Sequence, residues 1–473
     1  MFRRLLSALL LVGAIVAFAV NPLTLKLQVG ETAAPIQVTA QPRDLSLVCP
    51  GAVFRAGGST GTSLELTRVG SATVSGFFDA QAGLKLVEQR LNPEAPILGG
   101  LVNDSIAEAK SLTVQDPTGS AKQGSALLSA TQVQKVALSN LSGLAAANCI
   151  RPSSDAWLVG GDTSPGRETI LVLSNPSNVD SSVNLEVVST GGPIAAPGLS
   201  SISVPKLKTV AIALSGIAPN LSTFSVHVVS NGGALGTWLQ TRTIRGLTPG
   251  GIDFVGPSSD PAKSLAIPGV FLRGTADAAK LDKVNPAYDD LAPMLRITST
   301  SSRETTVTAQ ILGTNAKTFG TVIQQVVAPY STVDLPINGL ADGDYVALID
   351  SKEPVRAAIR LSRTKGSQTD FAWVPAVAPQ KDKLVFNSPA GAITKLAVAN
   401  PGKQSATVTV GSSSFTLAPA SSVSIVVTAG RSTSISSTAP VSASEVIDLG
   451  GLVSVVPVID YRNLGGSLEV VVH

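Results

Sequence analysis

Histidine is nearly absent from this sequence. Two of its 473 residues are histidine, His227 and the C-terminal His473. A Ser-His-Asp triad, a His-rich zinc site and a Cys-His pair each need an imidazole beside a nucleophile or a metal ion. The sequence therefore argues against histidine-based catalysis, and we expect no catalytic residue, no metal site and no cofactor.

Charged and aromatic side chains are also scarce. Charged residues make up 14% of the chain and aromatic residues 4%, and the formal net charge is +3 with Arg3 and Arg4 in the N-terminal segment. A nucleic-acid-binding protein carries a basic face or a run of lysine and arginine, and this chain has neither. We therefore expect no nucleic-acid partner.

The residues that are abundant are typical of β-structure. Hydrophobic residues account for 44% of the chain, in short apolar stretches rich in Val, Leu, Ile and Thr that are separated by Gly, Pro, Asn and Ser. β-branched residues favour strands, and the separating residues favour tight turns. The pattern predicts an all-β fold.

An internal repeat divides the chain. An apolar strand that ends near a proline recurs every ~100 to 120 residues, a period that suits a complete two-layer sandwich. The four strand heads are Leu47–Gly51, Asn148–Pro152, Leu265–Gly269 and Leu384–Pro389. We predict tandem immunoglobulin-like β-sandwich units, about four in number, that follow one another like beads on a string.

The repeat also sets the predicted boundaries. We expect a signal peptide or N-terminal membrane anchor at 1–22, a first unit with an irregular N-terminal part at 23–147, and further units at 148–260, 261–378 and 379–473. In the first unit, a short helix at Ile106–Ala109 is an open alternative to a strand. The linker near Ala276–Tyr288 has room for a turn of helix.

Asparagine-proline pairs mark an equivalent turn in two units. Asn175-Pro176 and Asn400-Pro401 each follow an apolar strand, and Thr300-Ser301 takes the corresponding place in the third unit. Proline fixes φ and asparagine tolerates the left-handed region, so these pairs predict tight connections between strands.

The N-terminal segment has the anatomy of an export signal. Arg3 and Arg4 precede an apolar run from Leu5 to Val20, and Ala17-Phe18-Ala19 fits a small-x-small cleavage site. The run is short for a spanning helix, so cleavage and retention as an anchor both stay open. We expect an exported protein, anchored at the extracellular face of the cytoplasmic membrane or secreted.

The two cysteines, Cys49 and Cys149, occur in the first and second strand heads. In an exported chain two cysteines favour pairing, and the C-x-x-C spacing of a redox pair is absent. We predict a structural disulfide between Cys49 and Cys149.

Other patterns that resemble chemical sites have simpler structural interpretations. Gly57-Gly58-Ser59-Thr60-Gly61 matches G-x-S-x-G, but a nucleophile elbow needs a following helix and here a strand is expected. Asp289-Asp290 and Asp342-Gly343-Asp344 could supply oxygens to calcium, yet neither reaches a full ligand set. A turn explains the glycine segment and Asp342-Gly343-Asp344.

The three tryptophans are candidates for both core packing and sugar binding. Trp238 and Trp373 lie in apolar strands, and Trp157 begins one. Core packing is favoured for all three. A sugar-binding platform needs an exposed aromatic face, and Trp157 with the nearby Asp162 is the candidate ligand contact.

The run Cys149-Ile150-Arg151-Pro152, with Trp157, Gly160-Gly161 and then Asn175-Pro176, resembles the signature of an uncharacterised actinobacterial family of exported, membrane-anchored proteins. The resemblance extends from Cys49-Pro50-Gly51 to the fourth unit. It implies an envelope location and no activity.

We therefore expect a non-catalytic scaffold or interaction protein of the cell envelope, which acts by binding or spacing. A carbohydrate-binding accessory to envelope polysaccharide synthesis is the alternative. The expected partners are an envelope protein or polysaccharide, and the membrane if the N-terminal segment is uncleaved.

Overall fold

The computed structural model describes residues 36–38, 44–57, 65–78, 85–90, 96–98, 104–115, 127–315, 320–381, 383–461 and 468–470. They belong to two compact units. The smaller unit covers residues 1–41 and 465–473, and in it strand β1 (Ile36–Val38) pairs antiparallel with β36 (Leu468–Val470). The larger unit spans Pro42–Leu464. The predicted N-terminal segment at 1–22 lies outside the described residues.

The fold is all-β, as the composition predicts. Within the described ranges, helix is confined to α2 (Thr275–Val284) and the 3-10 turns η1 (Leu214–Gly216) and η2 (Pro286–Leu291). The helical turn expected in the linker near Ala276–Tyr288 is therefore present, and no described helix is long and apolar enough to cross a membrane. The helix considered at Ile106–Ala109 is wrong, because Ile106 ends a strand paired with Ala72 and the chain bends before the next strand.

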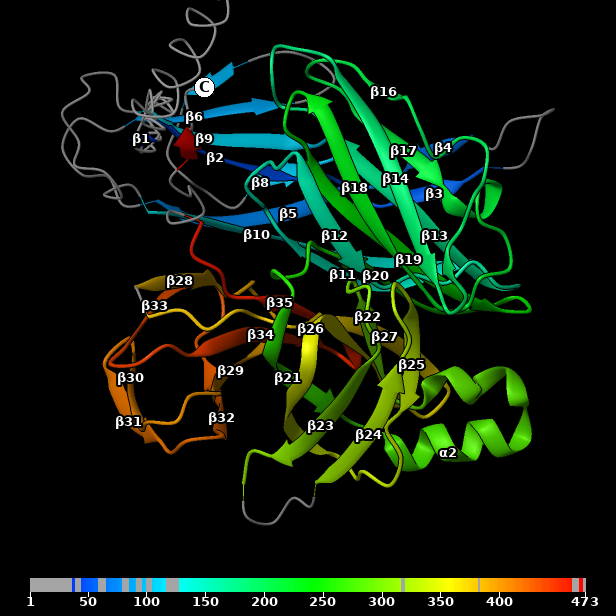
Figure 1. Cartoon of the computed structure of the whole chain (residues 1–473), viewed down its shortest axis with the longest axis vertical. Helices are drawn as coiled ribbons and strands as arrows, with labels where there is room; N and C mark the ends of the chain where they lie inside the picture. The colour runs from blue at the N-terminus through cyan, green and yellow to red at the C-terminus, as the bar shows by residue number, and fades with distance from the viewer. Residues whose placement is uncertain are drawn as a thin grey trace, which may run out of the picture. The chain divides into compact units, whose positions relative to one another are not determined.

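The strands of the larger unit form four groups (Figure 1). They are numbered here one to eight along each group, with the hairpin at 54–68 left out, the two short strands at 192–204 counted as one, and the long strand at 343–365 counted twice. In this numbering the same two antiparallel orders, 1-6-3-4 and 5-2-7-8, recur in every group. This recurring order is the three-dimensional form of the sequence repeat. The predicted boundaries at 261 and 379 fall between the last strand of one group and the first strand of the next, whereas residue 148 is the last residue of a strand.

Group 1 combines the sheet β2 (Asp44–Cys49), β9 (Lys110–Gln115), β6 (Lys85–Arg90), β7 (Pro96–Leu98) with the sheet β8 (Asp104–Ile106), β5 (Ala72–Phe78), β10 (Leu128–Leu138), β11 (Leu141–Asn148). An additional hairpin, β3 (Phe54–Ala56) and β4 (Leu66–Arg68), lies between its first two strands in sequence.

Group 2 also has two sheets. The first runs β12 (Asp155–Val159), β18 (Phe224–Gly232), β14 (Ser181–Ser189), and β14 also pairs with β15 (Gly192–Pro193) and β16 (Ile202–Val204). The second runs β17 (Thr209–Ala213), β13 (Arg167–Ser174), β19 (Gly236–Arg245), β20 (Thr248–Val255).

Group 3 differs in one respect, because a single long strand, β26 (Gly343–Lys365), serves both sheets. Its first half pairs with β21 (Ala262–Leu272) and β23 (Thr305–Gly313), which in turn pairs with β24 (Thr321–Val327). Its second half pairs with β22 (Met294–Ser299) and β27 (Gln368–Pro375), and β22 pairs with β25 (Thr332–Pro336).

Group 4 combines the sheet β28 (Leu384–Asn387), β33 (Ser432–Ser437), β30 (Ala406–Val410), β31 (Ser413–Leu417) with the sheet β32 (Ser421–Val427), β29 (Ile393–Asn400), β34 (Ser442–Leu449), β35 (Leu452–Pro457).

The groups are not beads on a string, because their cores merge in a cycle. The core of group 1 includes Trp238 of group 2, and the core of group 2 includes Phe371 of group 3. Val453 of group 4 packs in the core of group 3, and Leu144 of group 1 shares a core cluster with Ile447 of group 4. The four last strands make these contacts, since β11, β20, β27 and β35 each pack on the next around the cycle.

Two buried carboxylates join these last strands into a hub, which we define as Asp253, Asp370 and Ser454. Asp370 of β27 accepts hydrogen bonds from the backbone N–H groups of Leu144 (3.0 Å), Val453 (3.0 Å) and Ile252 (3.4 Å). Backbone groups of three other strands therefore converge on one side chain.

Asp253 of β20 completes the hub. It accepts a hydrogen bond from the Trp373 N–H (2.8 Å) and another from the Ser454 hydroxyl (2.6 Å), whose oxygen accepts one from the Ala146 N–H (3.1 Å). Asp253, Asp370 and Ser454 are fully buried. Because buried polar groups need partners, these bonds fix how the four groups pack on one another.

The predicted disulfide is confirmed. Cys49 and Cys149 are bonded and fully buried, with their Cα atoms 4.1 Å apart. Cys49 ends the first strand of group 1, and Cys149 follows its last strand, so the bond connects the two sheets of this group. Reciprocal backbone hydrogen bonds between Val48 and Ile150 lie beside it.

Candidate functional site

A cavity of about 700 Å³ opens where the segments that follow the four last strands meet. We call it the central cavity. Ile150 and Arg151 come from the segment after β11, Pro257 from the segment after β20, Gln380 from the segment after β27, and Tyr461 from the segment after β35. All four groups thus contribute to one site, which has a volume typical of small-molecule sites.

The wall of the central cavity is mainly apolar. Trp238 and Trp373, which are 0% and 2% exposed, contribute to it together with Phe254 and Leu265. The two tryptophans therefore pack in the interior, as predicted. The charged residues among the lining are Arg151, Asp155, Asp260, Lys381 and Asp460. Among the described residues of this lining there is no nucleophile-imidazole pair, since His227 does not belong to it.

The hub carboxylates do not line this cavity. Burial raises the pKa of Asp253 and of Asp370 well above the ordinary range for a carboxyl group, although their hydrogen bonds act in the opposite direction. The charge of Asp370 raises the pKa of Asp253 further. Raised carboxyl pKa values often mark catalytic acids. Here the carboxyl oxygens accept hydrogen bonds from backbone N–H and serine hydroxyl groups in a solvent-free interior, which is a structural role.

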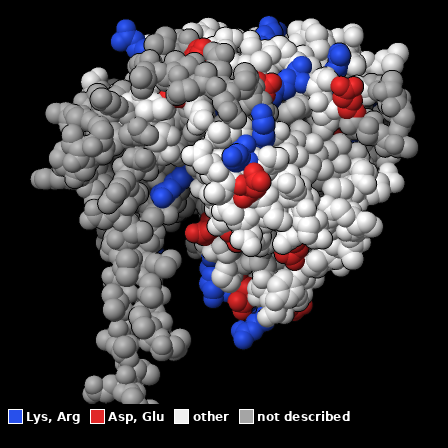
Figure 2. Space-filling view, turned by 90° about the horizontal axis from the view of Figure 1, so that it is seen from above, with Lys and Arg blue, Asp and Glu red and all other residues white. Residues whose placement is uncertain are grey.

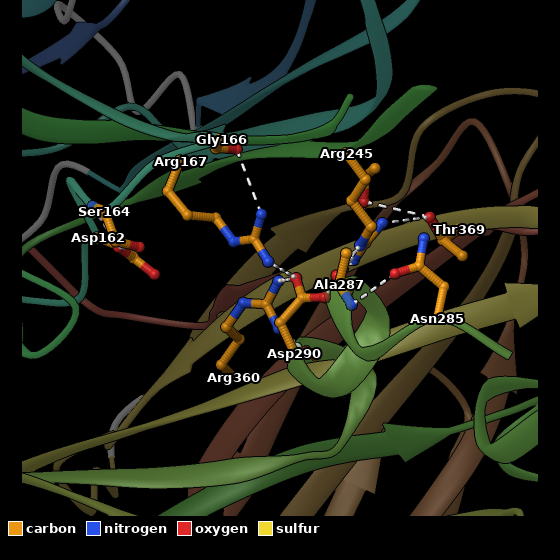
Figure 3. Close-up of polar contacts among 11 residues, drawn as sticks. Asp162, Ser164, Gly166, Arg167, Arg245, Asn285, Ala287, Asp290, Arg360 and Thr369 are labelled. Carbon is orange, nitrogen blue, oxygen red and sulfur yellow. Dashed lines mark hydrogen bonds and ion pairs between the residues drawn. The ribbon is translucent and has the colours of Figure 1, made fainter. Parts of the chain in front are cut away.

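A second polar cluster surrounds Asp290, near the contact between groups 2 and 3 (Figure 3). Its carboxylate contacts Arg245 (2.5 Å), Arg360 (2.9 Å) and Arg167 (3.2 Å). Arg245 also donates to the Thr369 hydroxyl (3.1 Å), as the dashed lines in Figure 3 show. Burial alone would raise the pKa of Asp290, but the three guanidinium groups outweigh burial and lower it. Calcium at Asp289-Asp290 is disfavoured because three cations already surround this carboxylate.

The second acidic pair also has structural partners. Asp342 accepts hydrogen bonds from the backbone N–H groups of Gly274 and Thr275, both at 2.9 Å, at the start of α2. Asp344 contacts Arg273 (2.6 Å) and Lys395 (2.7 Å). In the described part of the chain, no group of three or more His, Cys, Asp or Glu residues is arranged to hold a metal ion. Of the G-x-S-x-G segment, residues 58–61 lie outside the described residues.

Trp157 is half-buried on the outer face of the β12-β18-β14 sheet. Its indole stacks on the His227 imidazole with the ring centroids 4.4 Å apart, and the guanidinium carbon of Arg356 lies 5.3 Å from the same indole. His227 in turn contacts Asp155 (3.2 Å) and Glu186 (3.3 Å). Arg356 comes from β26, so this stack also connects groups 2 and 3.

The other predicted ligand contact, Asp162, lies beyond the end of β12. Its carboxylate accepts hydrogen bonds from the backbone N–H (2.8 Å) and the hydroxyl (2.5 Å) of Ser164. Asp162 bonds to Ser164 and Trp157 stacks on His227, so each of the two residues has its own partners. Asp162 instead lines a small crevice together with Arg167 and Arg360 of the Asp290 cluster.

Sequence reasoning missed the hub and the central cavity. Asp253-Phe254 and Asp370-Phe371 occur in the closing strands of two units, and an acidic residue within an apolar strand is the signal that could have revealed the hub. The signal for the cavity was the proline near the end of three closing strands, Pro257, Pro375 and Pro457. Neither signal shows that the segments meet in space.

The face in Figure 2 has no extended patch of one charge. Its Lys and Arg side chains are scattered among Asp and Glu on a largely uncharged surface.

Comparisons with known proteins give little functional information. One similar solved structure is described as "Crystal Structure of Thermotoga maritima 1070", with 14% identity and a TM-score of 0.19; the match covers 24% of this chain and 93% of that chain. Another is described as "Biofilm associated protein - BSP domain", with 9% identity and a TM-score of 0.11; it covers 91% of this chain and 96% of that chain. These scores are too low to carry an argument, and no curated protein matches the chain.

The family comparison agrees with the resemblance to an uncharacterised family. The family model described as "Family of unknown function (DUF5719)" matches residues 102–438. This match covers most of the chain, and the chain therefore belongs to that family of unknown function.

Proposed function

We propose that the protein is an exported scaffold or interaction protein of the cell envelope, which binds or spaces partners and catalyses no reaction. The observation that carries the proposal is the hub, because Asp253 and Asp370 hold four repeated groups in a defined arrangement through buried hydrogen bonds. Such an arrangement presents several sheet surfaces in fixed relation. The export signal expected at 1–22 and the resemblance to an actinobacterial envelope family support the location.

An affinity purification of the tagged full chain from envelope extracts tests this proposal. We expect a specific envelope protein or polysaccharide to be recovered with the wild-type chain. A Gly143→Leu variant, which places a large side chain against the hub, should recover less of that partner, while an exposed Leu247→Ala variant should recover the same amount. Recovery of a partner that the chain converts to a product would contradict a non-catalytic role.

Carbohydrate binding remains the second candidate because of the Trp157 stack. Aromatic faces flanked by carboxylates suit sugar rings, and Asp155 and Glu186 flank the His227 that stacks on Trp157. Against this, His227 and Arg356 already lie over the indole. The geometry thus favours a structural role for Trp157.

Trp157→Ala distinguishes the two functions. We expect the variant to be less stable by about 2 kcal/mol, since it loses a ring stack and a cation-π contact, without losing affinity for envelope glycans. Thermal unfolding and calorimetric titration with glycan fragments measure both effects. Unchanged stability together with lost glycan affinity would favour the carbohydrate-binding alternative.

A further inference from the structure

We propose that the central cavity binds the hydrocarbon chain of a neutral lipid. This inference goes beyond the proposed function, because it assigns a small-molecule ligand to the protein. Binding of that ligand can be measured on the purified chain, whatever the location or partners of the protein. It concerns the cavity formed by the segments after β11, β20, β27 and β35. None of the site residues predicted from the sequence lines this cavity.

The size and lining of the cavity support an apolar ligand. Its volume of about 700 Å³ lies within the 300–1,000 Å³ range of typical ligand sites. Trp238, Phe254 and Trp373 contribute aromatic surface, and Leu265 and Val455 contribute aliphatic surface. Burial of a hydrocarbon chain against such surface is favourable, because it removes apolar surface from water.

Proline residues in the wall make a peptide a poorer occupant. Pro257, Pro261, Pro375, Pro379 and Pro440 all line the cavity and provide no backbone N–H group. An extended peptide needs backbone donors and acceptors along its length, because each buried polar group without a partner is costly. A hydrocarbon chain has no such requirement.

The charges among the lining favour an uncharged head group. Arg151 and Lys381 are outnumbered by Asp155, Asp260 and Asp460, so the cavity does not select an anion.

Fluorescence titration of the purified full chain with a monoacylglycerol whose chain carries two bromine atoms tests the proposal. Bromine quenches indole fluorescence at near contact, so the ligand should quench Trp238 and Trp373. Ala262→Phe, which adds a ring at the cavity wall, should weaken binding about ten-fold, equivalent to ~1.4 kcal/mol. Ala276→Phe, on the exposed face of α2, should bind like wild type.

Several results would overturn the proposal. They are no quenching at all, equal binding by the wild-type chain and Ala262→Phe, and quenching that survives Trp238→Phe combined with Trp373→Phe. Binding of the N-terminal apolar segment to lipid cannot imitate the expected result, because that segment is identical in Ala262→Phe. Tighter binding of the corresponding fatty-acid anion would overturn the assignment of a neutral head group.

Discussion

At the scale of single residues, the interior of this protein depends on a few buried polar side chains. Besides the hub, Glu445 of β34 is fully buried. Burial raises its pKa to about 8, against the opposing effect of the nearby Ser388 hydroxyl. Its carboxyl group is therefore protonated in the folded protein near neutral pH.

Glu445 should make stability fall as pH rises. The folded state keeps the proton on Glu445 until about pH 8, whereas the unfolded chain releases it near the ordinary glutamate pKa. The free energy of unfolding therefore falls between about pH 4.5 and 8. The total loss is roughly 5 kcal/mol at most. Glu445→Gln should reduce this slope because it cannot ionise. Urea unfolding from pH 4.5 to 8.5 measures the effect, with exposed Glu304→Gln as control. Equal slopes for Glu445→Gln and wild type would contradict it.

Gly143 is the residue that lets β11 approach the hub. Its φ is +150°, and an added Cβ would lie 2.6 Å from Asp370 Oδ1 and 2.6 Å from the Ile252 nitrogen. We expect Gly143→Ala to destabilise the protein by about 3 kcal/mol, through steric displacement of buried hydrogen bonds. Gly246→Ala is the control, since its φ of +62° is also unfavourable for alanine but no atom lies within 4 Å. Equal losses in urea unfolding would show that the hub tolerates the methyl group.

At the scale of elements, the Asn-Pro turns are held by the asparagine side chains. Asn400 donates to the carbonyl oxygens of Gln404 (2.7 Å) and Leu417 (3.1 Å) and accepts from the Gly402 N–H (3.0 Å). Asn175 is bonded in the same way, to the carbonyl oxygens of Val179 (2.8 Å) and Val204 (3.0 Å). Each asparagine thus fastens its turn to a neighbouring strand end.

The third group shows what replaces this asparagine. The Ser299 N–H bonds to the Ser331 carbonyl just as the Asn175 N–H bonds to the Lys208 carbonyl, so Ser299 occupies the asparagine position. The sequence alignment with Thr300-Ser301 was therefore wrong by one residue. Ser299 is too short to bridge the turn, and its buried hydroxyl has no partner within the described residues.

Asn400→Ala should destabilise group 4 by about 2 kcal/mol, because it leaves buried carbonyl groups unsatisfied. Thermal unfolding measures the loss, and Asn231→Ala at an exposed position is the control. If both variants unfolded at the same temperature, the turn would owe its stability to proline and backbone pairing instead.

At the scale of the whole molecule, the closed packing of four groups couples their stabilities. In β13, Leu171 and Leu173 belong to the core of group 2, while Ile170 and Val172 belong to the core of group 1. Both faces of this strand are buried, which explains its uninterrupted apolar sequence. Loosening one group should therefore weaken its neighbours.

The disulfide tests this coupling. Its loop spans 100 residues, for which loop entropy predicts ~4.7 kcal/mol as an upper value. We expect Cys49→Ser with Cys149→Ser to lower the unfolding free energy by about 3 kcal/mol, in one cooperative transition that includes groups 2 to 4. Urea unfolding followed by tryptophan fluorescence reports this, since Trp238 and Trp373 lie in groups 2 and 3. A separate early transition confined to group 1 would argue against coupling.

The sequence by itself determined the all-β class, the strand period and the Cys49–Cys149 bond, because these depend on local propensity, turn residues and a single pair of thiols. Tertiary structure decided the rest. The alternating apolar residues of β14 predict that one face of this strand is buried. The continuous apolar run of β13 predicts that both of its faces are buried, but it does not identify the neighbouring group whose core covers the second face. The hub and the central cavity arise only when the last strands of four groups pack together, and no local pattern specifies packing between residues as far apart as Leu144 and Val453.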